Sequence, residues 1–251
     1  MDAQPDTNRT PLWIGLGVAA IIALLVGAFL LTRDDDDDDP VTADSTTTTA
    51  SEETTTTTAD ATTTTVPFQT VDADLPVFPD PTTSRRFDDP VAVATAFATE
   101  LVGFSDPVVG ELQEGDSRSG EIELRASADG APTVVLVRQL EDDSWYVIGS
   151  TTDSIQLATP EPRSTITSPQ ELIGMAYAFE GTVNVRLYVD GTQEPIAETV
   201  VTGRGDGVLG DFSGELEFSD ASGATHGVLV LSEASGEDGS AVAATTIRVL
   251  L

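Results

Sequence analysis

The chain has 251 residues, enough for one or two domains, and carries a formal net charge of −32. All eleven basic residues are arginines, and so acidic a chain repels nucleic acid, so we expect no nucleic-acid partner. The sequence contains no cysteine, which excludes disulfides, thiolate metal sites and lipid attachment at an N-terminal cysteine. The single histidine, His226, would have to serve any imidazole chemistry.

An apolar run from Leu12 to Leu31 is twenty residues long and contains no charge. A helix with a rise of ~1.5 Å per residue would span about 30 Å over this run, which is the hydrocarbon thickness of a bilayer. A cleaved signal peptide is the alternative, but its apolar core is about 7–15 residues long, and no A-x-A site follows here. We therefore predict a cytoplasmic tail over 1–11 and a single transmembrane helix, an uncleaved signal anchor, over 12–32.

The charges beside this span predict its orientation. Arg9 and Arg33 lie on opposite sides, so basic residues decide little. The acidic run 34–39 decides more, because a bacterial membrane is negative inside and each exported anion gains about 2.3 kcal/mol per 100 mV. We expect a single-pass protein of the cell membrane whose C-terminal domains are extracytoplasmic.

Small residues recur every four positions within the predicted span. Such a stripe suits close helix pairing and would support a homodimer, whereas the alternative is ordinary lipid-facing filler. The residues concerned are Gly15, Ala19, Ala23 and Gly27.

The segment 33–84 is rich in Asp, Thr and Pro. Between Asp34 and Ser84 it holds thirteen acidic residues and no basic one, and threonine runs fill 46–65. Such a composition buries too little apolar surface to offset chain entropy, and self-repulsion keeps it extended. We predict a disordered linker, with Thr-rich stretches suited to O-glycosylation.

Residues 85–160 predict a small α+β domain, with one helix on an antiparallel sheet. Asp89-Pro90 is typical of a helix start, an apolar stripe follows at helical spacing, and Gly103 ends the helix. GEIELRA (120–126), PTVVLVRQL (132–140) and WYVIGS (145–150) then predict strands, and SIQLA (154–158) is a candidate fourth. Trp145 is expected to be a core residue rather than a ligand platform.

Residues 161–251 contain about seven short strands separated by turn signals, the profile of an all-β immunoglobulin-like sandwich. Alternation in TVNVRLYV (182–189) predicts one buried face, and Asp190-Gly191 predicts a hairpin turn. HGVLVLSEAS (226–235) is nearly continuously apolar at its centre, as in a central strand. Ile247, Val249 and Leu251 are expected to point inward in the last strand.

The order of these segments resembles the immunoglobulin-like domain of bacterial spore-germination proteins, the type associated with GerMN domains. ITSP, ELIGMAYAFEGTVNVRLYVDG, GDFSGELEF and a final strand ending RVLL carry the likeness, above all AFEGTV (178–183). The resemblance covers about 164–251. It implies a bacterial, envelope-located, non-catalytic module and supplies no catalytic residue.

The loop GRGDGVLG (203–210) contains two familiar signatures. Gly205, Gly207 and Gly210 spell the dinucleotide fingerprint, but a strand rather than a helix is predicted to follow, so no helix N-terminus would meet a pyrophosphate. Arg204-Gly205-Asp206 is the tripeptide that integrins bind, and chance is the expected explanation, because specific recognition needs a surrounding interface. The glycines more plainly permit positive φ in a loop.

We therefore predict no catalytic, cofactor-binding or metal-binding residue, no cofactor, and no enzymatic activity. His226 is expected to be a lone exposed histidine, and Glu237-Asp238 a charged turn rather than a calcium site. The leading hypothesis is a membrane-anchored extracytoplasmic protein that presents an immunoglobulin-like module to an envelope protein or wall polymer. The alternatives are an ectodomain sensor or regulator that signals through a membrane partner, and a cell-wall hydrolase accessory protein.

Overall fold

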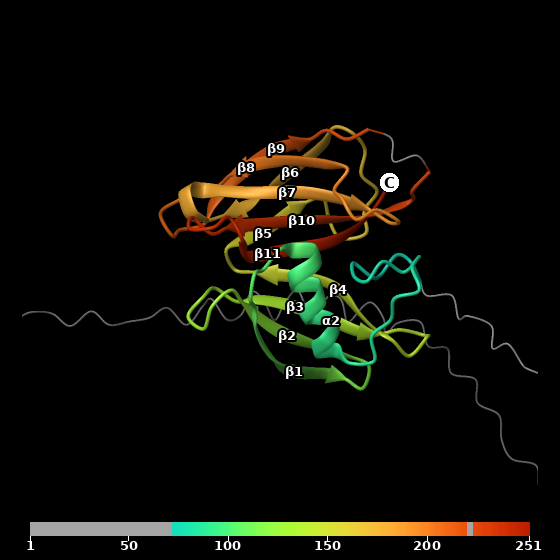
Figure 1. Ribbon diagram of the computed structural model, residues 1–251. Helices are drawn as coiled ribbons and strands as arrows, with labels where there is room; N and C mark the ends of the chain where they lie inside the picture. Colours follow the sequence, from blue (N-terminus) through green and yellow to red (C-terminus); the bar gives the residue numbers. More distant parts are fainter. Residues whose placement is uncertain (1–71, 220–222) are drawn as a thin grey trace, which may run out of the picture. The chain divides into compact units, whose positions relative to one another are not determined.

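The computed structural model describes residues 72–219 and 223–251, and its fold is mostly antiparallel β-sheet with one short helical segment (Figure 1). The predicted tail, membrane span with its small-residue stripe, and linker as far as Val71 lie outside these residues. No helix within the described ranges has the length and apolarity needed to cross a bilayer.

The predicted linker extends too far at its C-terminal end. Residues 72–84, called the strap below, belong to the folded part of the chain. Val77 and Phe78 are buried there, and both donate backbone hydrogen bonds to the carbonyl of Val147. Four apolar or aromatic residues other than proline, from Leu75 to Phe87, are enough to anchor this stretch, although its Pro and Asp content is typical of a linker.

The helix begins and ends as the sequence predicts. It comprises an α-helical part, α2 (Pro90–Ala96), and a π-helical continuation, η1 (Phe97–Val102). The Asp89 carboxylate caps the first turn, and Gly103 ends the helix in the left-handed conformation with φ 98°. Helical spacing of the apolar residues from Val93 predicts that the buried stripe ends on Leu101. It ends on Val102 instead, because the wider π turn rotates the last residues relative to an ideal α-helix.

Four antiparallel strands lie beneath this helix in the order β1-β2-β3-β4. They are β1 (Val108–Asp116), β2 (Ser119–Arg125), β3 (Thr133–Gln139) and β4 (Trp145–Thr152). The last three confirm predicted strands. The first was missed, because it is a largely exposed edge strand interrupted by two glycines, and its apolar residues do not alternate. Trp145 is only partly buried against the core, whereas its neighbour Tyr146 is fully buried.

Seven strands complete the fold, in two layers. One layer continues the main path as β11-β10-β7-β8, while β6 pairs with β5 and β9 in the other. Side chains from both, including Leu187, Leu229, Leu172 and Phe212, form one buried cluster. The strands are β5 (Ile155–Thr159), β6 (Gln170–Ala176), β7 (Thr182–Val189), β8 (Ala197–Thr202), β9 (Gly210–Leu216), β10 (His226–Ala234) and β11 (Ala241–Leu250).

The predicted boundary between 160 and 161 does not separate two independent bodies. Strand β5, which the prediction gave to the first domain, pairs with β6 over four registered positions and with β4 at one. The cluster beneath the helix also includes Tyr188, Val228 and Ala244 from the C-terminal strands. The described residues therefore share their apolar contacts across the predicted boundary and lie within one compact unit.

Candidate functional site

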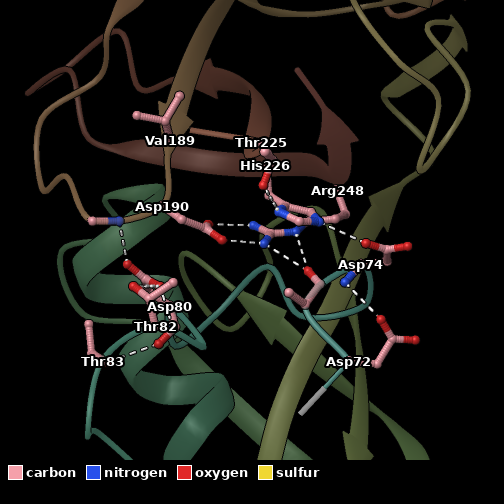
Figure 2. Close-up of polar contacts among 12 residues, drawn as sticks. Asp72, Asp74, Asp80, Thr82, Thr83, Val189, Asp190, Thr225, His226 and Arg248 are labelled. Atoms are coloured by element: carbon pink, nitrogen blue, oxygen red, sulfur yellow. Dashed lines mark hydrogen bonds and ion pairs between the residues drawn. The ribbon is translucent and has the colours of Figure 1, made fainter. Parts of the chain in front are cut away.

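The strap is fastened to the C-terminal strands by a buried ion pair (Figure 2). Arg248, on β11, has a side chain only 1 % exposed, and it pairs with Asp190, which is 12 % exposed. Arg248 Nη1 donates to Asp190 Oδ1 at 2.7 Å, while Nε and Nη2 donate to the carbonyl of Ala73 at 3.0 and 2.8 Å. A guanidinium so satisfied from two directions holds the start of the strap against the ends of β7 and β11.

Sequence reasoning missed this contact although it read the strand correctly. Ile247 and Val249 point into the buried cluster of the C-terminal strands as predicted, which turns Arg248 to the other face. That face would be solvent-exposed if the strap were a linker. Burial of Arg248 is therefore decided by a segment about 175 residues earlier in the chain.

The predicted turn at Asp190-Gly191 forms, because the Thr192 N–H donates to the carbonyl of Val189 at 3.1 Å, but it lies in a longer connection than a two-residue hairpin. Strand β7 ends at Val189 and β8 begins at Ala197, so the connection is a longer loop. The carboxylate of Asp190 is held by Arg248, and the backbone N–H of Gly191 donates to Asp80 Oδ2 at 2.6 Å. These two contacts to Arg248 and the strap hold the loop in addition to the hydrogen bond of its own turn.

His226 is not the lone exposed histidine that the sequence predicts. Its side chain is 20 % exposed, with Nε2 lying 2.7 Å from Asp74 Oδ1 and Nδ1 lying 2.7 Å from the hydroxyl of Thr225. A hydroxyl, an imidazole and a carboxylate in one line resemble the relay of nucleophilic catalysis. Neither of the two grooves described in this structure is lined by any of the three, so we assign them to strap attachment.

A groove of about 460 Å³ lies where the helix end meets β7, β8 and the β10–β11 turn. Its polar lining comes chiefly from Asn184, Arg186, Glu198, Thr199 and Ser232. The volume falls in the range of about 300–1,000 Å³ that is typical of small-molecule sites. Its apolar lining is supplied by Val102, Val185, Val200, Ala234 and Ala241.

Arg186 is the distinctive charge in this groove. Its Nη2 donates to the carbonyl of Val102 at 2.8 Å, while its Nε is buried and has no hydrogen-bond partner among the described residues. Its guanidinium lies 6.0 Å from the Tyr188 ring centre. Burial raises the pKa of the Tyr188 hydroxyl, and the nearby Arg186 charge offsets this rise in part.

Arg186 and Glu198 face each other in register on β7 and β8, and both line the groove. They nevertheless form no ion pair within 4.0 Å in the described part of the chain. Six other arginines there do pair with a carboxylate, as for example Arg85 with Glu100, which lowers the pKa of that glutamate. The groove lining thus includes one positive and one negative group side by side that do not neutralise each other through an ion pair within 4.0 Å.

The 203–210 loop holds its two charges against each other. Arg204 Nε donates to Asp206 Oδ1 at 3.0 Å, Nη2 pairs with the other carboxylate oxygen, and this contact lowers the pKa of Asp206. A binding partner that contacts Arg204 and Asp206 separately would have to break this ion pair. The segment that follows the glycine fingerprint is strand β9, as predicted. No helix N-terminus is therefore present there to bind a pyrophosphate.

The same loop packs on the AFEGTV stretch through backbone hydrogen bonds. The N–H of Gly203 donates to the carbonyl of Gly181 at 2.8 Å, and Ala178 and Ala176 exchange 3.0 Å bonds with Arg204. A Cβ on Gly203 would lie 2.6 Å from the carbonyl oxygen of Ala176. This close approach, rather than a phosphate, accounts for glycine at position 203.

We expect Gly203→Ala to lower the free energy of unfolding by about 1–3 kcal/mol, because a backbone oxygen cannot yield to the new methyl group. Gly115→Ala is the matched control, since its Cβ would meet nothing closer than 3.6 Å, and it should stay within about 0.5 kcal/mol. Urea unfolding followed by circular dichroism measures both. Equal stability of the two variants would show that the loop does not need this close contact.

The 235–240 turn satisfies its own acidic side chain. Asp238 Oδ1 accepts hydrogen bonds from the Ser240 N–H at 3.0 Å and hydroxyl at 2.7 Å, which lowers the pKa of Asp238. No group of three or more acidic, histidine or cysteine side chains suited to a metal occurs in residues 72–219 and 223–251.

Comparison with known proteins identifies one domain. Residues 154–240 match the family described as the immunoglobulin-like domain of bacterial spore germination, Gmad2. The match begins with β5 and ends in the β10–β11 turn, so it starts earlier than the resemblance at 164 and agrees with the pairing of β5 to β6. No curated protein and no solved structure matches the chain.

Proposed function

We propose that this chain, which contains a Gmad2 spore-germination domain, is a non-enzymatic membrane-anchored protein that presents that domain to partners in the bacterial cell envelope. The domain match is the observation that carries the proposal. The apolar run 12–31 and the acidic stretch after it supply the anchor and the tether. In this proposal a small helix-on-sheet body, β1–β4 with α2, accompanies the immunoglobulin-like sandwich as its support.

The way the strap is attached supports a tethered arrangement. A tether that enters at residue 72 meets its first fixed point at Ala73, whose carbonyl accepts from the buried Arg248. Asp74 and Asp80 add contacts to His226 and Gly191. Tension on the tether would therefore be met first by side chains within the Gmad2 region and β11, before it reaches the strap residues that pack on the helix and its sheet.

Fractionation of bacteria that express the full chain with a C-terminal tag tests the location. We expect the tag in the membrane fraction, resistant to alkaline carbonate, and removed by protease added outside intact protoplasts. A Leu24→Asp/Leu25→Asp variant should leave the membrane, because each acidic residue at a span centre costs about 2.5–3.5 kcal/mol. Thr47→Asp, which adds charge to the predicted linker, should change nothing.

A separate cross-linking experiment tests whether the domain is presented to a partner. Photo-cross-linking, which needs no lysine, from the exposed β6 residue Ile173 in intact cells should give a discrete adduct with the wild-type chain. The Leu24→Asp/Leu25→Asp variant, which should leave the membrane, should give none. Recovery of the wild-type chain from the cytosol, or trimmed of its first residues, would overturn the anchored location. Absence of any adduct from several exposed positions would overturn presentation.

A further inference from the structure

We propose that the groove between the helix end, β7, β8 and the β10–β11 turn binds a small zwitterion, an aliphatic α-amino acid or an end of a short peptide of that kind. Arg186 would take the carboxylate and Glu198 the ammonium group. The inference does not depend on where the protein is located, and it goes beyond presentation of the domain to a partner.

The side-by-side charges carry the inference. Residues directly opposite on antiparallel strands have Cβ atoms about 4.5–5.5 Å apart, close enough for both charges to reach one small molecule. Arg186 and Glu198 are such a pair, and they do not neutralise each other by direct contact. Asn184, Thr199 and Ser232 add amide and hydroxyl groups on the same lining.

The charge of the whole chain selects a zwitterion over an anion. A formal net charge of −32 repels any ligand with net negative charge, and it attracts cations to the many carboxylates elsewhere on the surface. A zwitterion is neutral and so avoids the repulsion. Its two charged ends lie at the separation that one arginine and one glutamate can meet together.

The apolar part of the groove lining determines which side chain of a ligand fits. Val102, Val185 and Val200 flank the charges, and Gly103, Gly239 and the alanines 234 and 241 leave the space between them open. A volume of about 460 Å³ holds a branched aliphatic side chain with room for a second small residue. Leucine combines the two required charges with such a side chain, and we take it as the probe.

Binding is tested by saturation-transfer NMR titration of the full chain with three molecules of matched carbon skeleton. They are L-leucine, 4-methylpentanoate, which lacks the ammonium group, and isopentylamine, which lacks the carboxylate. We expect saturable binding of L-leucine in the micromolar to millimolar range, and binding at least about tenfold weaker for each of the others, equivalent to about 1.4 kcal/mol per lost charge contact.

Variants locate the site. Arg186→Gln and Glu198→Gln should each weaken L-leucine binding at least about tenfold, whereas Arg163→Gln and Glu171→Gln, exposed charges outside the groove, should leave it unchanged. Circular dichroism melting checks that each variant is folded. If Arg186→Gln unfolds, the exposed Glu198 and the two analogues still decide the matter. No saturable L-leucine signal, equal binding of 4-methylpentanoate, or equal loss in the control variants would overturn the proposal.

Discussion

Replacing Arg248 with methionine is expected to lower the free energy of unfolding by about 3–5 kcal/mol. Methionine fills much of the same space, but it leaves the largely buried carboxylate of Asp190 without its partner and the carbonyl of Ala73 without its donors. An uncompensated buried charge is the main cost. Urea unfolding of the full chain, followed by far-ultraviolet circular dichroism, measures the change.

Two further variants separate the ion pair from its surroundings. Arg248→Met combined with Asp190→Leu removes both charges, and we expect it to recover most of the loss, because apolar residues often replace a buried pair at little cost. Arg163→Met removes an exposed arginine and should stay within about 0.5 kcal/mol. If the single Arg248 variant were no less stable than the Arg163 variant, the strap would not depend on the ion pair.

Phe97→Ala is expected to cost about 3–5 kcal/mol, the range for deletion of a buried aromatic ring. Phe97 is fully buried at the centre of the helical segment, and its ring meets that of Phe78 edge-on, with centroids 6.3 Å apart. The truncation therefore leaves a cavity between the helix, the sheet and the strap. Beyond global stability, it should loosen the strap, so that trypsin cuts faster after Arg85 and Arg86.

The controls for this prediction are a smaller change and an exposed one. Phe97→Leu keeps most of the apolar volume and should cost less than the alanine variant, and Val208→Ala, at a position 56 % exposed, should stay within about 0.5 kcal/mol. Circular dichroism melting measures the stabilities of the variants, and timed trypsin digestion measures how fast the strap is cleaved. Unchanged digestion in an otherwise destabilised Phe97→Ala variant would show that Phe78 is not held by this contact.

The sequence could predict the face of β7 on which Arg186 lies, but it could not predict the groove over that face. Periodicity placed Val183, Val185 and Leu187 inward on β7, and by the same count it turned Arg186 outward. What lies over an outward residue is not a local property. The end of the helix and the β10–β11 turn convert that outward face into a groove lining, and no pattern within β7 announces either.

The Gmad2 likeness was recognisable from AFEGTV and the strands around it, and residues 154–240 match that family. Local chemistry also fixed the helix start at Asp89-Pro90, its stop at Gly103, and most of the strands. These features depend on neighbours a few residues apart, which is why one sequence suffices to find them.

Tertiary structure alone decided the remainder. Strap burial, the satisfied Arg248, the hydrogen-bonded His226 and the attachment of the 190–196 loop all come from contacts between segments far apart in the sequence. The composition of the strap is that of a linker, because the surface that covers its few apolar residues is supplied by β4 and the helix and not by the strap itself. Composition reports how much apolar surface a segment has, whereas only the folded chain shows where that surface is covered.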